Sequence, residues 1–276
     1  MQGPIGVFDS GYGGLTILKD IVKLLPQYDY IYLGDNARAP YGTRSFDIVY
    51  EYTLQAVKYL FSQGCQLVIL ACNTASAKAL RSIQQKNLND LDPDRRVLGV
   101  IRPTAECLGE YTKTGVVGIL GTPGTIRSQS YDMEIAKLYP LFKVFSHACP
   151  MWVPLVEYGE ADKPGADYFV KKDVDTLLEQ SPDIDTIVLA CTHYPHLYKK
   201  IRNVVPENIK IISQGEIVAK ATLDYLKRHP EMETRCKKGG TLNLLTTEDS
   251  SKFDIMAERF LGTNLKATHV DLDKMQ

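Results

Sequence analysis

The stretch IGVFDSGYGGLTILKDIVKLL, residues 5–25, decides the fold of this chain. It opens with a short apolar run, passes through a glycine-rich turn and continues into a segment of helical length. Apolar residues then recur at helical spacing at Leu18, Ile21, Val22 and Leu25. The pattern predicts a strand, a turn and a helix whose apolar stripe docks on a sheet.

The same alternation continues along the chain. The next apolar runs, 30–33 and 66–70, are each followed by a segment of helical length, within 46–61 and at 74–85. Further β-branched or apolar runs follow at 96–101, 115–120, 142–148, 186–190, 210–213 and 241–245. Strands that alternate with helices in this way predict an α/β fold with mostly parallel sheets and covering helices.

A weak internal repeat indicates two similar α/β lobes. Residues 67–74 read LVILACNT and residues 187–192 read IVLACT, so each copy is an apolar strand that ends in Ala-Cys and a small polar residue. The strand ends of two such lobes would face a shared cleft, where we expect the active site.

The lobe boundaries are inferred from a charged stretch of sequence and from the number of strand–helix units. The polar stretch QQKNLNDLDPDRR at 84–96 separates the first three units from the rest. A second crossing is expected near 206–210. The first lobe is therefore predicted to be 1–97 plus about 210–276, and the second 98–209.

Composition excludes several classes of protein. The 276 residues are 44% hydrophobic and 24% charged, which is typical of a globular chain. With 32 basic and 33 acidic residues the net charge is −1, which disfavours nucleic acid as a partner. No apolar run is long enough to cross a bilayer and no leader is evident, so we expect a cytoplasmic protein without a membrane partner.

Polar and reactive side chains follow the predicted strands. In open α/β sheets, ligands bind beyond the carboxyl ends of the strands. The residues at those positions are Asp9, Ser10, Asp35, Asn36, Cys72, Asn73, Thr74, Thr122, Cys191, Thr192 and His193. The six cysteines include no C-x-x-C pair, and this pattern argues against a disulfide framework.

Cys72 and Cys191 are the strongest catalytic candidates. Each lies between a predicted strand and a helix N-terminus, whose partial positive charge stabilises a thiolate. One thiol from each lobe would place an acid or base on either face of a chiral centre, which is the arrangement for two-base racemisation. Asp9 could assist the first thiol and His193 the second. Suitable donors for substrate carboxylates are Ser10, Asn73, Thr74, Thr122 and Thr192.

Other sites find less support. The turns DSGYGG and GTPGT match neither the dinucleotide fingerprint nor the P-loop, and the nucleophile elbow of Ser-His-Asp hydrolases is absent. Only Cys191 and His193 are spaced as metal ligands could be, so no metal site is predicted. Cys149, which has His147 and Glu157 as sequence neighbours, is interpreted as structural, like Cys65, Cys107 and Cys236.

Five motifs resemble those of the glutamate racemases in the aspartate/glutamate racemase superfamily. They are IGVFDSGYGGLT, YLGDNARAPYG, ILACNTASA, ACPMWVPLVEYGE and VLACTHYPHL. The resemblance implies a cofactor-independent enzyme that supplies D-glutamate for peptidoglycan. It assigns proton transfer to Cys72 and Cys191, with assistance from Asp9, His193 and Glu157. The substrate contacts it implies are Asp9, Ser10, Tyr41, Gly42, Asn73, Thr74, Thr192 and His193.

The resemblance also implies two α/β lobes and a homodimer. Arg102 and Gln214 depart from the family pattern, which bears on dimer geometry and regulation. Three alternatives stay open: a racemase for another acidic amino acid such as aspartate, a carboxylate-binding module without turnover, and a pyridoxal-phosphate enzyme that uses a lysine such as Lys78.

Overall fold

Two parallel sheets, each covered by helices, form the protein, and the computed structural model describes residues 2–262 and 265–272. The strands are β1 (Ile5–Asp9), β2 (Tyr30–Gly34), β3 (Leu67–Leu70), β4 (Arg96–Gly99), β5 (Val116–Gly121), β6 (Lys143–Ala148), β7 (Thr186–Ala190), β8 (Lys210–Ile212), β9 (Leu242–Thr246) and β10 (Ala267–His269). The six-stranded sheet has the order β10-β9-β2-β1-β3-β4, and the four-stranded sheet has the order β6-β5-β7-β8.

The helices alternate with these strands. They are α1 (Leu15–Leu24), α2 (Phe46–Ser62), α3 (Asn73–Lys78), α4 (Leu80–Ser82), α5 (Leu88–Leu91), α6 (Ile101–Glu106), α7 (Leu108–Tyr111), α8 (Pro123–Arg127), α9 (Ser130–Leu138), α10 (Trp152–Glu157), α11 (Pro164–Leu178), α12 (Tyr198–Val204), α13 (Gly215–Arg228), α14 (Pro230–Glu233) and α15 (Ser250–Leu261). Single turns of other geometry are η1 (Asn36–Arg38), η2 (Ile83–Asn87) and η3 (Tyr194–Leu197).

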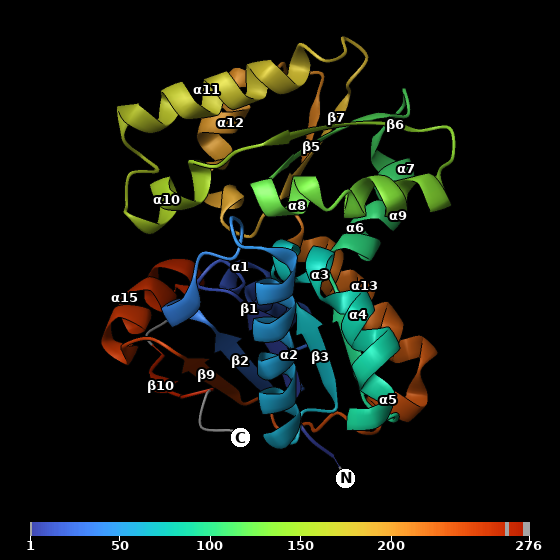
Figure 1. Ribbon diagram of the computed structural model, residues 1–276, viewed down its shortest axis with the longest axis vertical. Helices are drawn as coiled ribbons and strands as arrows, with labels where there is room; N and C mark the ends of the chain where they lie inside the picture. Colours follow the sequence, from blue (N-terminus) through green and yellow to red (C-terminus); the bar gives the residue numbers. More distant parts are fainter. Residues whose placement is uncertain (1, 263–264, 273–276) are drawn as a thin grey trace.

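The chain leaves the first sheet once and returns to it. Figure 1 shows the four-stranded sheet with its green and yellow helices above the six-stranded sheet, while the orange and red C-terminal elements lie beside the blue N-terminal ones. Strand β9 pairs in parallel with β2, and α13 packs on α1. The C-terminal segment therefore completes the first α/β part.

The sheets explain why polar residues gather at one edge. Strand β1 pairs in parallel with both β2 and β3, so Phe8 lies opposite Leu33 on one side and Leu70 on the other. All five residues of β1 are buried. Because parallel strands end at the same edge, the residues that follow β1 and β3 meet there.

The predicted alternation of strands and helices is confirmed, with two local differences. Strand β4, which follows the charged stretch 84–96, still pairs with β3 in the first sheet. The predicted helix at 74–85 is divided among α3, α4 and the start of η2. The lobe boundaries at 97 and about 210 stay a prediction, and the pairing of β4 favours a first crossing just after Gly99.

No helix in the described ranges combines the length and apolarity needed to cross a membrane.

Candidate active site

The two cysteines predicted to transfer protons line one small cavity. Cys72 follows β3 and Cys191 follows β7, so each comes from a different sheet, and each is only 6% exposed. The cavity has a volume of about 90 Å³. Eleven of the twelve predicted site residues line it: Ser10, Tyr41, Gly42, Cys72, Asn73, Thr74, Thr122, Glu157, Cys191, Thr192 and His193.

Asp9, the twelfth, lies behind the cavity wall. It is fully buried, where one carboxylate oxygen accepts the Gly11 N–H at 2.9 Å and the other accepts the Thr192 hydroxyl at 3.3 Å. Burial raises the pKa of Asp9, and the positive charge of His193 opposes that rise. Asp9 therefore links the first thiol's side of the cavity to the second thiol's side through Thr192.

Cys72 is surrounded by a hydroxyl and by the first turn of α3. Its Sγ lies 3.4 Å from the Ser10 hydroxyl and accepts the Ala75 N–H at 3.4 Å. Burial and the negative charge of Asp9 raise the pKa of the Cys72 thiol to about 12, against the opposing effect of those two hydrogen bonds. At neutral pH, the Cys72 thiol therefore holds its proton.

Cys191 faces an imidazole and a carboxylate instead. Its Sγ lies 4.0 Å from Nδ1 of His193, whose Nε2 lies 3.0 Å from Oε1 of Glu157, the last residue of α10. Burial alone would lower the pKa of His193. The hydrogen bonds and negative charges of Cys191 and Glu157 outweigh it and raise that pKa to about 10. Cys191 therefore has a protonated imidazole beside it at neutral pH.

A close approach at Gly13 sets the position of this second thiol's partners. A Cβ added to Gly13 would lie 2.3 Å from Oγ1 of Thr192 and 2.5 Å from Nδ1 of His193. The N-terminal turn after β1 therefore touches the segment after β7, and only glycine fits between them. The DSGYGG motif thus serves packing across the cavity as well as the turn itself.

Three threonine hydroxyls form a ring, and two of them, those of Thr74 and Thr122, belong to residues that line the cavity. Oγ1 of Thr74 lies 2.9 Å from Oγ1 of Thr122 and 3.3 Å from that of Thr125, and the last two atoms are 3.1 Å apart. Thr74 belongs to α3 and Thr122 directly precedes α8, so the ring joins the two α/β parts. Nearby, the Gly124 N–H donates to the carbonyl of Gly42 at 2.7 Å.

Asn73 and Tyr41 have protein partners as well as positions on the cavity. The Asn73 amide donates to Gln214 Oε1 at 2.6 Å and accepts from the Tyr131 hydroxyl at 2.7 Å. Gln214 Nε2 donates to the Tyr131 hydroxyl at 2.8 Å and to Thr104 at 2.9 Å. We call these four residues the Gln214 ring. The Tyr41 hydroxyl donates to Asp35.

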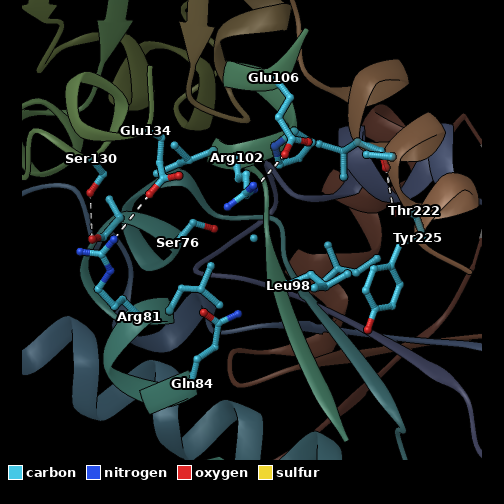
Figure 2. Close-up of a pocket in the computed structure, with 18 of the residues that line it drawn as sticks. Ser76, Arg81, Gln84, Leu98, Arg102, Glu106, Ser130, Glu134, Thr222 and Tyr225 are labelled. Carbon is cyan, nitrogen blue, oxygen red and sulfur yellow. Dashed lines mark hydrogen bonds and ion pairs between the residues drawn. The ribbon is translucent and has the colours of Figure 1, made fainter. Parts of the chain in front are cut away.

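A larger cavity of about 550 Å³ lies elsewhere, between α3, α4, α6, α9 and α13, and Figure 2 shows part of its lining. Cysteine is absent from its described lining. Arg102, one of the two departures from the family pattern, pairs there with Glu106 at 2.8 Å, and Arg81 lies 3.6 Å from Glu134. The chemistry of the thiol pair therefore belongs to the small cavity.

The remaining lining of the small cavity was missed by the sequence analysis. Those residues are Ala39, Pro40, Thr43, Pro123, Cys149, Pro150, Val153 and Pro154. Four of them stand in ACPMWVPLVEYGE, a motif that the resemblance had singled out for Glu157 alone. The alanine, the valine and the four prolines among them carry no chemical signature, so reasoning from residue type does not single them out.

Comparison with known proteins identifies the family. The model of the Asp/Glu/hydantoin racemases matches residues 5–222, a range that includes both thiols, Glu157 and His193. The chain belongs to this racemase family. Among curated relatives of this racemase, the glutamate racemase of Geobacter metallireducens is 40% identical over 95% of this chain and 93% of its own length. That of Streptococcus gordonii is 38% identical over 98% of each chain.

Solved structures similar to this racemase are glutamate racemases too. One from Bacillus anthracis matches with a TM-score of 0.89 and 35% identity over 98% of both chains. One from Francisella tularensis, solved in complex with D-glutamate, matches with a TM-score of 0.86 and 32% identity over 99% of both chains. An aspartate racemase from Picrophilus torridus shares the fold at 19% identity.

Proposed function

We propose that this racemase interconverts L- and D-glutamate by a cofactor-independent transfer of the α-proton between Cys72 and Cys191. The observation that carries the proposal is the pair of buried thiols, one from each sheet, that line the same small cavity. A thiol on each face of the stereocentre allows one to remove the proton while the other supplies a proton to the opposite face.

The two protonation states serve opposite enantiomers. With Cys72 as thiol and Cys191 as thiolate, Cys191 takes the α-proton and Cys72 delivers one to the other face. The product then leaves the pair with Cys191 as thiol and Cys72 as thiolate, which is the state that removes the proton of the other enantiomer. The protonated His193 lies beside Cys191, and Glu157 holds His193 in place.

The cavity also has the means to stabilise negative charge on the substrate. The α-proton of an amino acid is weakly acidic, so the carbanion-like state needs preorganised donors in a site shielded from water. Hydroxyls of Ser10, Thr74, Thr122 and Thr192 line the cavity for this purpose. Ser10 lies beside Cys72, and Thr192 lies next in sequence to Cys191. We assign the substrate's carboxylates to these groups.

Glutamate is favoured over aspartate as the substrate. Relatives named glutamate racemase are 36–40% identical along nearly the whole chain, whereas the aspartate racemase from Picrophilus torridus is 19% identical and shares the fold alone. A binding module without turnover is disfavoured because both thiols and their assisting groups are in place. The pyridoxal-phosphate alternative is disfavoured as well, because Lys78, the lysine it would use, donates a hydrogen bond to the Arg44 carbonyl at 2.6 Å and so has a structural partner.

We further propose the wider setting of the enzyme. Its D-glutamate would supply peptidoglycan in the cytoplasm, where the precursors are made. Residues 1–97 with about 210–276 and residues 98–209 would act as two lobes that close on substrate. A homodimer would be the working form, with no metal or organic cofactor in the reaction.

Proton exchange measured by NMR tests the proposal. L-glutamate is incubated in D2O with the protein, without added pyridoxal phosphate or metal, and the D-isomer is assayed in parallel. We expect loss of the α-proton signal together with formation of D-glutamate. If the α-proton signal is retained with glutamate and lost with aspartate, the substrate is aspartate. Retention of the signal with both amino acids would overturn the racemase proposal.

A further inference from the structure

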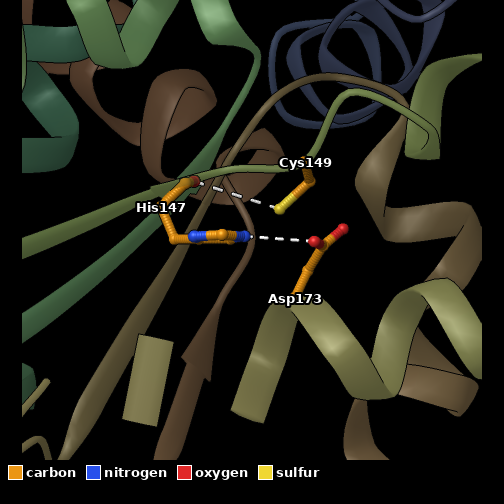
Figure 3. Close-up of side chains that lie close together, drawn as sticks. All are labelled: His147, Cys149 and Asp173. Atoms are coloured by element: carbon orange, nitrogen blue, oxygen red, sulfur yellow. Dashed lines mark hydrogen bonds and ion pairs between the residues drawn. The ribbon is translucent and has the colours of Figure 1, made fainter. Parts of the chain in front are cut away.

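Three donor side chains that have no assigned part in racemisation converge between the end of β6 and α11. Nε2 of His147, Sγ of Cys149 and a carboxylate oxygen of Asp173 all lie within 4.8 Å of one another. Figure 3 shows His147 and Cys149 from the end of β6 pointing toward Asp173 on α11. The sequence analysis had treated Cys149 as structural and had not considered Asp173 at all.

The fold itself brings the three together. His147 and Cys149 are two residues apart at the end of a strand, so their side chains leave the same face of the chain. That face meets α11, where Asp173 is one of the buried residues. Cys149 is 1% exposed and Asp173 is 5% exposed, while the side chain of His147 keeps 22% of its surface in contact with solvent.

The donor atoms of the three groups lie close to one another. Nε2 of His147 lies 3.1 Å from Oδ1 of Asp173, and the Cys149 thiol makes a long contact of 3.9 Å with the His147 carbonyl. Donor atoms around a tetrahedral zinc ion lie roughly 3.3–3.8 Å apart, given bonds of about 2.0–2.3 Å. The observed spacing is within a side-chain rotation of that geometry.

We propose that His147, Cys149 and Asp173 form a binding site for one zinc-like divalent cation. One imidazole nitrogen, one thiolate and one carboxylate are a donor set that suits borderline-soft cations better than Mg²⁺ or Ca²⁺. The cation displaces the thiol proton of Cys149 to solvent, and His147 binds through Nε2 with its proton on Nδ1. A thiolate and a carboxylate neutralise the two positive charges, which offsets the cost of burying the ion.

The site has an open side and an inner side. His147 is the most exposed of the three residues and faces the route by which the cation enters. The fourth coordination position is then taken by water. Cys149 also lines the substrate cavity, and its carbonyl accepts the Tyr194 hydroxyl at 3.1 Å. A bound cation would therefore fix the position of Cys149 in the cavity wall, at the start of the segment that continues to Glu157.

Cobalt titration of the full chain tests the site without using turnover. Co²⁺ bound by a thiolate absorbs in the near ultraviolet, and Zn²⁺ displaces it. The titration is made on the Cys72→Ser/Cys191→Ser double variant, because the cavity thiols beside His193 would otherwise compete for the ion. We expect one Co²⁺ per chain with a thiolate band, and displacement by one equivalent of Zn²⁺.

Single substitutions in that background assign the ligands. Cys149→Ser should abolish the thiolate band, and His147→Gln or Asp173→Asn should each weaken binding by at least about tenfold. Two matched controls should bind as the background does. Cys107→Ser removes a thiol that donates to the Thr104 carbonyl at 3.2 Å, and His229→Gln breaks an exposed histidine–glutamate pair of 3.0 Å.

Two results would overturn the site. No thiolate band in the background variant would leave His147 and Asp173 as a plain hydrogen-bonded pair, and unchanged affinity in Asp173→Asn would place the ion elsewhere. Should Cys149→Ser fail to fold by circular dichroism, the other two substitutions decide the matter. Because the readout is absorbance, failure here leaves the racemase proposal standing, and failure of the racemase assay leaves this site standing.

Discussion

The two thiols occupy unlike surroundings although the proposed reaction treats them alike. Cys72 has a hydroxyl, a backbone N–H and the buried Asp9 nearby, and its pKa is raised to about 12. Cys191 has the imidazole of His193, whose own pKa is raised to about 10. A proton is therefore held on the Cys72 side while a positive charge stands on the Cys191 side. Symmetric chemistry does not need symmetric neighbours, provided that each side can both hold and release one proton.

Removal of either thiol is the strongest way to break this comparison. Cys72→Ser and Cys191→Ser should each lower racemisation by about 10³-fold or more, because a serine hydroxyl is a far weaker acid and base at the same position. The rate of D-glutamate formation measures this. Cys107→Ser, outside the cavity, is the control and should keep the parent rate. Near-normal activity in either cavity variant would end the two-base mechanism.

A methyl group at Gly13 would displace Thr192 and His193, the two residues that follow Cys191. Its Cβ would lie 2.5 Å from Nδ1 of His193, so the imidazole must move, and a displacement of about 1 Å costs about 10²-fold in rate. We expect Gly13→Ala to lower kcat by about that factor in a folded protein.

Gly165→Ala supplies the matched control. A Cβ on that residue of α11 meets no atom within 4 Å, so activity should be unchanged. Equal rates for Gly13→Ala and the parent enzyme would show that the contact across the cavity has no bearing on catalysis.

The charge of Glu157 sharpens the comparison through pH. In Glu157→Gln the pKa of His193 should fall from about 10, because a hydrogen bond and a negative charge that favour the imidazolium are lost. The basic limb of the kcat profile should move to lower pH, with kcat reduced about tenfold at neutral pH. An unchanged basic limb would show that the protonation of His193 does not control kcat. The control is Glu160→Gln, an exposed change in the same segment that should leave the profile in place.

The same shift has a consequence for stability. Because the pKa of His193 is raised above its ordinary value of 6.5, its protonation stabilises the folded state fully below pH 6.5. That contribution declines as the pH rises to about 10. Urea unfolding measured between pH 6.5 and about 10 should show this fall in the free energy of unfolding in the parent enzyme. In Glu157→Gln the fall should span a narrower range of pH.

Gln214→Met has the smallest expected effect on activity. The change removes three hydrogen bonds of the Gln214 ring and leaves the buried amide N–H group of Asn73 unpaired, while Thr104 keeps its hydrogen bond to the Val100 carbonyl. The free energy of unfolding should fall by about 1–3 kcal/mol, and kcat by a few-fold, since Asn73 adjoins Cys72. Urea unfolding measures the first. The control is the exposed Gln85→Met, which should change the free energy of unfolding by less than about 0.5 kcal/mol. An equal loss in both variants would show that the Gln214 ring does not stabilise the fold.

The strand ends were predictable because their signal is local. An apolar run followed by a polar residue marks the edge where a parallel sheet presents ligands, and Asp9, Cys72 and Cys191 each carry that mark within a few residues. The alternation of strands and helices is local in the same sense. Both could therefore be inferred without knowledge of distant contacts.

Contacts between distant residues were beyond such reasoning. Gln214 was noticed as an unusual residue, yet its partner Asn73 is 141 positions away and no periodicity links them. Asp173 lies in the middle of a helix, where a single carboxylate gives no sign that it meets His147. Strand β10 is three residues long and was missed for lack of any apolar run.

The threonine ring bears on how one pocket can serve mirror-image molecules. In a triangle of Thr74, Thr122 and Thr125 hydroxyls, each oxygen can either donate or accept, so the hydrogen bonds can circulate clockwise or anticlockwise. Reversal needs only rotation of three O–H bonds, with every heavy atom left in place. Thr74 and Thr122, which line the cavity, can therefore turn their O–H bonds in either sense, which would serve the proposed binding of both enantiomers of glutamate.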